Sequence, residues 1–474
     1  MTDRPDALAY LSATQLAARV RARELSPVDL VEHYLARIER FDRRLGAFVT
    51  VTADAAREAA RRAEAEVVRG ELRGPLHGVP FAVKDQFDTQ GIRTTVGSRI
   101  LDANVPAEDA TVVARLKSAG AILLGKLNLS EFAFGGTVCF PFGQPRNPWH
   151  PDHQPGGSSG GSAVATAAAL AAFTLGEDTG GSVRGPAAWC GCVGLRPTWG
   201  LVSRHGTFSV SWSMDTAGPL TRAVEDSALV LGVIAGYDPK DPLTSRRPLP
   251  DYRAAFGGDA RGLRIGLILE LVDGEGTHAE VRQAVRDAAR TLEALGASVE
   301  DVSLPTSLVA GAVFMALCDS EGAARHQEWL RHRSADYDQG TRRRLLTASL
   351  LPAALYHQAQ RARALIRQEI LEAFQRYDLL VGPTRPTPAP AIGKEAEPVA
   401  SAAGAARRFF GARADTTPFS LAGTPAISIP CGFSSAGLPI GLQLAGAPFT
   451  EPAIFRVAHA FERATAWHTR HPPL

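Results

Sequence analysis

Three short segments of the chain carry residues whose types and spacing could do chemistry. The first is the glycine- and serine-rich run at 155–162, which leads directly into an alanine-rich stretch that predicts a helix. Glycines just before a helix let the backbone approach a ligand closely and direct N–H groups toward it. The alternative is a flexible linker, which we disfavour because a linker does not normally run straight into a helix.

The second segment, Asp178–Arg184, follows an apolar stretch and has two glycines immediately before Ser182. Successive glycines permit a turn in which several backbone N–H groups converge, and an oxyanion hole requires such a turn. Taken alone, the segment also fits a plain turn between a strand and a helix.

The third segment ends in Lys84, directly after the apolar run Val79–Val83, which predicts a strand. A lysine carried into the interior loses hydration, which lowers its pKa, and the neutral amine can then accept a proton. Arginine effectively cannot do this. The chain has five lysines against 46 arginines, so a lysine in an apolar setting is notable. The equally weighted alternative is an ion pair with the adjacent Asp85.

Three other patterns imitate known sites and are set aside. Gly157–Gly161 fits the motif G-x-S-x-G around Ser159, but that motif must follow a strand, and here a proline-rich loop precedes it. Gly120–Lys126 resembles a phosphate loop but lacks the hydroxyl residue that binds magnesium. His150 and His153 have a proline between them that breaks any helix, and no acidic ligand set is evident, so we predict no metal site.

Composition excludes several classes of function. The net charge is +2, from 51 basic and 49 acidic residues, so the chain lacks the excess of positive charge that is typical of proteins that bind nucleic acid or an anionic membrane. Five cysteines without a paired pattern disfavour a disulfide framework and a zinc site. The first residues lack the apolar core of a signal peptide, and no uncharged apolar run is long enough to span a bilayer. We therefore expect a cytoplasmic protein.

The elements that would position the three segments alternate between helices and short strands. A helix is predicted to begin at Pro27 after the capping Ser26, and further helices at 53–69, 111–119, 163–169, 279–295 and 351–374. Strands are predicted at 79–83, 121–124, 171–175 and 263–269. Such alternation favours an α/β fold with a mixed or parallel sheet.

In this order and spacing, Lys84, the glycine loop with Ser158 and Ser159, and Ser182 resemble the amidase signature family. The likeness is nearly continuous over 78–238 and returns near the end of the chain, so it covers roughly half of the sequence. It implies an α/β amidase signature fold, in which helices cover both faces of a large mixed β-sheet.

The resemblance also implies one amidase domain over residues 1–474. Its parts would be N-terminal helices at 1–70, the signature core at about 75–238, and a C-terminal half at 262–474 that completes the sheet and the pocket.

The family pattern implies roles for individual residues. Ser182 falls on the nucleophile, Ser158 on a bridging serine held by a cis peptide, and Lys84 on the base. The oxyanion hole falls on the backbone N–H groups of Thr179, Gly180, Gly181 and Ser182. By the same pattern, the residues that support the site are Ser159, Asp178 and Arg184. The residues that form the walls of the substrate pocket are Phe134, Gly135 and Trp212.

The activity that the resemblance implies is hydrolysis of a carboxylic amide to an acid and ammonia or an amine, through an acyl-serine and without a cofactor. We expect a small-molecule amide as substrate, no nucleic-acid or membrane partner, and a chain that can form a homodimer. Two alternatives are kept. One is the glutaminase (A) subunit of a Glu-tRNA(Gln)/Asp-tRNA(Asn) amidotransferase, and the other is a non-catalytic binding relative.

Two departures from the family pattern bear on these alternatives. Glu177 stands where the family usually has a small residue. Arg413 stands where the glutaminase branch carries an aspartate that holds the glutamine amino group, and Asp415 is out of register. An arginine repels an ammonium group, so we favour a stand-alone amidase. The proline- and alanine-rich loop at 384–405 indicates a pocket without strong charge.

Overall fold

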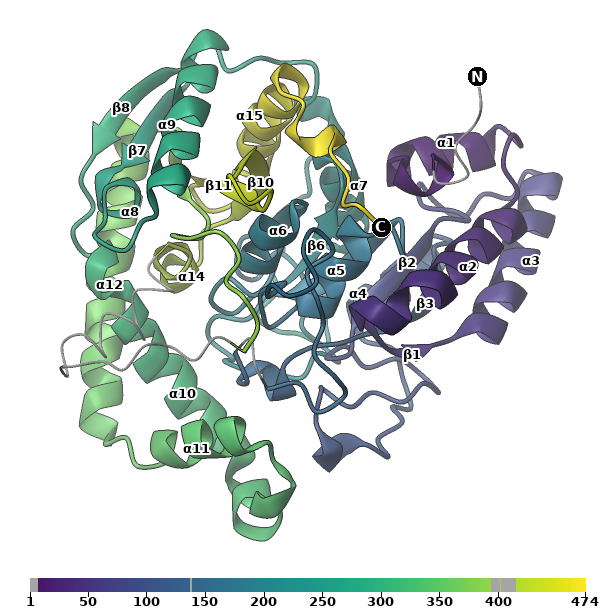
Figure 1. Ribbon diagram of the computed structural model, residues 1–474, viewed down its shortest axis with the longest axis horizontal. Helices are drawn as coiled ribbons and strands as arrows, with labels where there is room; N and C mark the ends of the chain where they lie inside the picture. Colours follow the sequence, from purple (N-terminus) through teal and green to yellow (C-terminus); the bar gives the residue numbers. More distant parts are fainter. Residues whose placement is uncertain (1–6, 137–138, 394–400, 402–414) are drawn as a thin grey trace.

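The computed structural model describes residues 7–136, 139–393, 401 and 415–474, and its centre is one sheet of eleven strands (Figure 1). The strands are β1 (Phe48–Val51), β2 (Pro80–Lys84), β3 (Ile122–Leu127), β4 (Phe173–Glu177), β5 (Val193–Arg196), β6 (Ala217–Thr221), β7 (Arg264–Ile268), β8 (Ser298–Val302), β9 (Leu379–Pro383), β10 (Ala426–Phe433) and β11 (Pro439–Gly446). They lie in the order β1-β3-β2-β4-β6-β5-β10-β11-β9-β7-β8. β2 pairs in parallel with β3 and β4, whereas β10 pairs antiparallel with β5 and β11, so the sheet is mixed.

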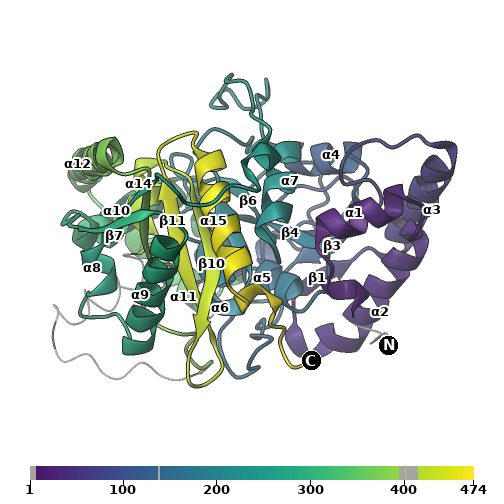
Figure 2. The ribbon, with the colours of Figure 1, turned by 90° about the horizontal axis from the view of Figure 1, so that it is seen from above.

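Helices surround this sheet, with the N-terminal helices α1–α3 at one end of the molecule and α10–α12 toward the other (Figures 1 and 2). Their bounds are α1 (Ala13–Arg21), α2 (Pro27–Leu45), α3 (Ala53–Arg69), α4 (Thr111–Ser118), α5 (Gly160–Ala167), α6 (Arg184–Cys190), α7 (Val224–Ile234), α8 (Leu269–Val272), α9 (Ala279–Ala294), α10 (Ser307–His332), α11 (Gln339–Ala348), α12 (Ala353–Arg376), α14 (Thr417–Ala422) and α15 (Glu451–Ala464).

The alternating directions of side chains along the strands show that helices cover both faces of the sheet. In β9, Leu379 and Val381 pack into one hydrophobic cluster, which also contains residues of α2, α7 and α15. Leu380, between them, packs into a second cluster, which contains residues of α10, α12 and α14. Successive residues of a strand point to opposite faces, so the two clusters lie on opposite sides of the sheet. The predicted mixed sheet with helices on both faces is confirmed.

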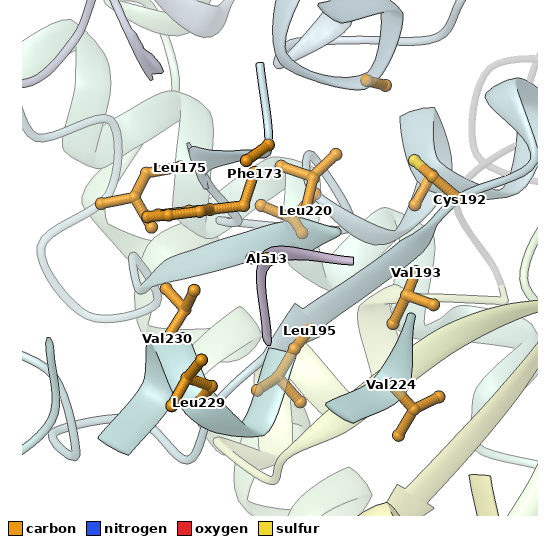
Figure 3. Packing of buried hydrophobic residues seen from close by; sticks show 14 of the residues in the cluster. Ala13, Phe173, Leu175, Cys192, Val193, Leu195, Leu220, Val224, Leu229 and Val230 are labelled. Carbon is orange, nitrogen blue, oxygen red and sulfur yellow. The ribbon is translucent and has the colours of Figure 1, made fainter. Parts of the chain in front are cut away.

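The core beside the centre of the sheet consists of short apolar strands and one apolar helix. Figure 3 shows side chains of β4, β5, β6 and α7 packed against one another, among them Phe173, Leu175, Leu195, Leu220 and Val230. Each of these side chains is buried, and burial of one such side chain contributes roughly 1.5–3 kcal/mol. This packing holds the end of β4, and with it the segment Asp178–Arg184, in a fixed place.

Most predicted elements are present, although their ends are shifted. Ser26 caps α2 by accepting hydrogen bonds from two backbone N–H groups, and Pro27 is the first helical residue, as predicted. The helix predicted at 163–169 begins three residues earlier, inside the glycine-rich run. The strand predicted at 171–175 spans Phe173–Glu177, which places Glu177 at its end. Of the predicted loop at 384–405, only 384–393 and 401 lie within the described residues.

Within the described ranges, α10 is the one helix long and apolar enough, by length and composition alone, to cross a membrane. In its most apolar stretch, 61% is buried inside the protein, where α10 packs against α11, α12 and α14. A core helix of a globular protein has the same properties.

Candidate active site

Lys84 is the last residue of β2, which lies between β3 and β4 and is buried along its whole length. Its side chain has no exposed surface. Lys84 Nζ donates hydrogen bonds to Ser158 Oγ at 2.8 Å and to the Glu177 carbonyl oxygen at 3.4 Å, and it lies 3.5 Å from Glu177 Oε2. The adjacent Asp85 pairs with Lys126 instead, at 3.2 Å.

Burial is the main influence on the charge of Lys84. Removal of the ammonium from water lowers the pKa of Lys84, and the carboxylates of Glu177, Asp215 and Asp178 partly oppose this. A lower pKa increases the fraction of neutral amine near neutral pH. The neutral amine has a free electron pair, so it can accept a proton from the hydroxyl of Ser158.

Ser158 and Ser159 occupy the turn that enters α5. The peptide bond between Gly157 and Ser158 is cis, as the family pattern implies. Ser159 Oγ donates to the Glu177 carbonyl oxygen at 3.3 Å, and the Ser159 N–H donates to the Ser182 carbonyl oxygen at 3.3 Å. Ser159 therefore ties the glycine loop to the segment that carries Ser182.

Ser182 lies in the turn between the end of β4 and the start of α6, where it is half-buried. The preceding Gly181 has a φ of +111°, a conformation that L side chains rarely adopt. A Cβ on Gly181 would lie 2.3 Å from Thr416 Oγ1, so only glycine fits here. Thr416 Oγ1 donates to the Gly180 carbonyl oxygen at 2.8 Å, which fixes the turn from outside. Nothing local in the sequence singles out Thr416.

The predicted oxyanion hole needs one correction. The N–H of Gly181 donates to the Asp178 carboxylate at 2.7 Å and is not available to a ligand, because a short aspartate side chain readily bonds the backbone of its own turn. In the described part of the chain, the N–H groups of Thr179, Gly180 and Ser182 meet no acceptor, and all three residues line the cavity described below. Three such donors can stabilise an oxyanion.

Asp178 lies beneath this turn and forms ion pairs with Arg184 at 3.0 Å and Arg196 at 3.2 Å. All three side chains are fully buried. Burial alone would raise the pKa of Asp178, but the two guanidinium groups outweigh it and hold that pKa well below its usual range. This geometry explains how Asp178 and Arg184 support the turn. Sequence reasoning missed Arg196, whose only signal is its place within the family-like segment 190–198.

A cavity of about 280 Å³ opens over both serines. Its floor comes from the two turns, namely Gly157, Ser158, Thr179, Gly180, Gly181 and Ser182. Its walls are Ala133, Gly136, Trp189, Val210, Phe314, Cys318, Arg344 and Arg385. The structure thus brings Ser158 and Ser182 to one cavity, with Lys84 buried beneath Ser158.

The predicted walls Phe134, Gly135 and Trp212 do not line this cavity. Two residues with positive φ just before Phe134 turn the chain, so the Phe134 ring packs against Gly322 of α10. A Cβ on Gly322 would lie 2.1 Å from that ring. Trp212 is 55% exposed. Ala133 lines the cavity in place of Phe134.

Two arginines line the cavity, so the prediction of a pocket without strong charge is wrong. Arg344 of α11 forms an ion pair with Asp319 at 2.6 Å. Arg385 follows β9 and lies over the ring of Trp189, with its guanidinium carbon 5.1 Å from the ring centre. The guanidinium also lies against Gly185, where a Cβ would be 2.0 Å from it, so a side chain at 185 would displace the guanidinium from this position.

Arg413 lies outside the described residues, so its predicted effect on glutamine binding stays a prediction. Asp415 is buried, and burial raises the pKa of Asp415 to about 8, although Arg385 opposes this. Its side chain is therefore mostly neutral at pH 7.

Among the described residues, no group of three or more His, Cys, Asp and Glu side chains is arranged to hold a metal ion. The rings of His150 and His153 lie 4.3 Å apart, but no acidic side chain completes a ligand set there. All five cysteines are free and buried.

Comparison with known proteins adds to this geometry. A family model described as Amidase matches residues 29–455. The chain belongs to the amidase signature family. A peptide amidase from Stenotrophomonas maltophilia is 35% identical, with 98% of each chain covered and a TM-score of 0.83. Another solved structure, from work on a vestigial protein complex and the evolutionary origins of an s-triazine catabolic enzyme, is 36% identical. The comparison with that structure covers 96% of this chain and 98% of the other chain and has a TM-score of 0.88.

Among curated relatives, a glutamyl-tRNA(Gln) amidotransferase subunit from Geobacter metallireducens is 44% identical, over 97% of this chain and 98% of the relative. This identity is higher than that to either solved structure. The comparisons therefore favour the amidotransferase alternative over the stand-alone amidase that the sequence analysis prefers.

Proposed function

We propose that this protein hydrolyses a carboxylic amide through an acyl-serine intermediate on Ser182. The observation that carries the proposal is the 2.8 Å hydrogen bond from Lys84 Nζ to Ser158 Oγ, buried beneath a cavity that Ser158 shares with Ser182. A base, a hydroxyl that can relay a proton, and a nucleophile are thus available together, which is the arrangement that serine catalysis requires.

In the proposed reaction, Ser182 Oγ attacks the carbonyl carbon of the amide. Its proton moves to Ser158 Oγ while the proton of Ser158 moves to the neutral amine of Lys84, since a hydroxyl can donate and accept at once. The N–H groups of the turn before and at Ser182 stabilise the negative oxygen. The proton then returns to the leaving nitrogen, the C–N bond breaks, and water releases the acyl group by the same route.

The charge of the cavity supports a substrate class. Arg344 forms an ion pair with Asp319, and the guanidinium of Arg385 lies at the cavity wall over the ring of Trp189. A permanent cation in a partly enclosed cavity favours a substrate that carries a carboxylate as well as its amide. Glutamine and dicarboxylic acid monoamides belong to this class.

The substrate class is tested with Arg385→Met, using Trp212→Ala as the matched surface control. For a carboxylate-bearing amide, the methionine variant should raise KM by about 10- to 100-fold, the effect of losing a charge-assisted hydrogen bond. For a neutral amide of the same length, KM should stay within about twofold. An equal loss on both substrates would contradict the assignment of Arg385 to the carboxylate.

A second candidate function is supply of ammonia within a transfer-RNA amidotransferase. The observation that favours it is the 44% identity, across nearly the whole chain, to one of the subunits of such an enzyme. The two candidates share the chemistry at Ser182 and differ in substrate and partners. Ammonia release from glutamine, enhanced by the other amidotransferase subunits, supports the second candidate. Fast hydrolysis of other amides without glutamine turnover supports the stand-alone amidase.

Activity itself is tested with Ser182→Ala. Amide hydrolysis should fall to background while the thermal unfolding temperature stays within a few degrees of the parent, because Ser182 is half-buried and lies in a turn. Full activity in Ser182→Ala would remove both candidates. The single domain, cofactor-free chemistry, a homodimer and a cytoplasmic location remain predictions.

A further inference from the structure

Three acidic residues lie around Lys84, and one of them, Glu177, departs from the family pattern. Glu177 ends β4, with its carboxyl oxygen Oε2 3.5 Å from Lys84 Nζ. Asp178 follows Glu177 and forms ion pairs with Arg184 and Arg196. Asp215 precedes β6. Glu177 and Asp215 are both buried, and the mechanism above assigns them no task.

The hydroxyl of Thr179 lies between these two carboxyl groups. Thr179 Oγ1 is 2.8 Å from Glu177 Oε1 and 2.9 Å from Asp215 Oδ1. A hydroxyl has one proton, so it can donate to only one of them. The other short contact is a hydrogen bond only if that carboxyl group is protonated and donates to Thr179. If both groups were ionised, two oxygens would face each other in the interior without a proton between them.

The remaining contacts of Asp215 agree with one shared proton. Asp215 accepts from the hydroxyl of Ser209 and from the N–H groups of Val210 and Ser211, so it can carry a negative charge. Burial and the charge of Glu177 raise the pKa of Asp215 to about 8. Two adjacent carboxyl groups rarely ionise together, and the first proton lost belongs to the pair.

The charges directly beneath the pair agree with this state. Arg184 and Arg196 carry two positive charges and Asp178 carries one negative charge, so these three groups together carry one positive charge. Glu177 and Asp215 with one shared proton carry one negative charge. The charges of these five groups sum to zero, so they do not require a charged Lys84. Of the other charged groups nearby, Lys126 pairs with Asp85, whereas Arg325 of α10 faces both Asp215 and Asp88. Cys318 of α10 carries no charge because burial raises the pKa of its thiol. A proton on the pair removes one of the two negative charges that would favour an ionised Lys84.

We propose that Glu177 and Asp215 hold one proton between them through the Thr179 hydroxyl, and that this pair keeps Lys84 in its neutral, proton-accepting form. In the transfer, the Lys84 ammonium loses a proton and becomes an amine, and the pair of carboxylates gains that proton. Glu177 and Asp215 are positioning residues in this scheme, since they act through Lys84. The role of Lys84 rests on the proposed function, whereas the shared proton does not.

The pH profile of kcat/KM distinguishes a shared proton from two independent carboxylates. In Glu177→Gln the one negative charge resides on Asp215, which does not contact Lys84, so the acid limb should move about one pH unit lower. In Asp215→Asn the charge is confined to Glu177, beside Lys84, so the acid limb should move higher. Two independent carboxylates would each raise the pKa of Lys84, and both variants would then move the limb lower.

The control is Glu451→Gln, which changes another buried glutamate that accepts from a threonine hydroxyl, Thr198. Its acid limb should match the parent. The proposal is overturned if Asp215→Asn moves the limb lower or leaves it in place, or if Glu177→Gln lowers kcat without moving the limb, as a purely structural role predicts.

Asp215→Asn can fail to fold, because Asp215 accepts bonds from three groups of its own loop. Infrared spectroscopy then tests the proton directly and needs no turnover. The difference spectrum of the parent minus Glu177→Gln at neutral pH should contain the C=O band of one protonated carboxyl group, since Asp215 alone ionises. Absence of that band overturns the shared proton even if Ser182 is the nucleophile. Its presence together with an active Ser182→Ala would overturn only the proposed function.

Discussion

Two buried lysines lie side by side in the sheet and differ in almost everything except burial. Lys84 ends β2 and Lys126 lies on the neighbouring parallel strand β3, one residue out of register. Neither side chain has exposed surface, and burial lowers the pKa of each. Lys126 has three close acceptors: Asp85 Oδ1 at 3.2 Å, the Phe87 carbonyl oxygen at 2.7 Å and Thr94 Oγ1 at 2.6 Å.

The partners of the two lysines explain why one is structural and the other is available for chemistry. The Thr94 hydroxyl donates its own proton to a backbone carbonyl, so it accepts from Lys126, and three acceptors suit a charged ammonium. Lys84 has one short contact, to a serine hydroxyl at the floor of the cavity, and two contacts of 3.4–3.5 Å to Glu177. Burial alone therefore does not identify a base; the number and kind of acceptors do.

The largest expected effect comes from Lys84→Met. Loss of the base should reduce kcat/KM by about 10⁴-fold, at the upper end for general base catalysis. The thermal unfolding temperature should change little, because a buried amine in its neutral form is replaced by an apolar side chain of similar length. Lys84→Arg keeps the charge but not the base, so it should lose as much activity. Substantial turnover in Lys84→Arg would contradict the role of Lys84.

The matched change, Lys126→Met, should act on stability instead. It leaves the carboxyl group of Asp85 buried without its cation, which should lower the free energy of unfolding by about 3–5 kcal/mol. Denaturant unfolding measures this loss. Turnover per folded molecule, measured well below the unfolding temperature, should remain near the parental value. A stable but inactive Lys126→Met would contradict the structural role that we assign to Lys126 in contrast to Lys84.

A smaller and more discriminating pair removes one hydroxyl from each lysine. Ser158→Ala should reduce kcat/KM by about 10²-fold, because the proton has no relay to Lys84. Thr94→Val should leave kcat/KM unchanged and lower the free energy of unfolding by about 1 kcal/mol, the contribution of a typical hydrogen bond. Steady-state kinetics and thermal unfolding on both variants provide the comparison. Equal kinetic effects would show that the two hydroxyls do not differ in role.

Much of the floor of the site is predictable from local sequence. Glycines next to Ser158 and Ser182, and an apolar strand before Lys84, are local features, and each lies where its pattern indicates. The walls are not predictable in this way. Arg385, Arg344 and Phe314 come from segments more than 130 residues beyond Ser182, and only the folded sheet brings them to the cavity. No local pattern marks them.

The wrong predictions have the same physical origin. Phe134 is adjacent to the cavity in sequence, but the positive φ of the preceding residues turns its ring toward α10. Gly181 belongs to the predicted oxyanion turn, yet its N–H is used by Asp178. In both positions the residue type fits the prediction, and the direction of a side chain or an N–H group decides the outcome. Direction depends on contacts with distant elements, such as Thr416 beside Gly181.

In the proposed reaction, Ser182 forms the covalent bond to the substrate and is activated by Lys84 through Ser158. The most direct measurement is peptide mapping by mass spectrometry after treatment with a serine-directed acylating probe. We expect one adduct, on the peptide that contains Ser182, and strongly reduced labelling in Lys84→Met. An adduct on Ser158, Ser159 or another residue, with Ser182 unmodified while activity is lost, would contradict it.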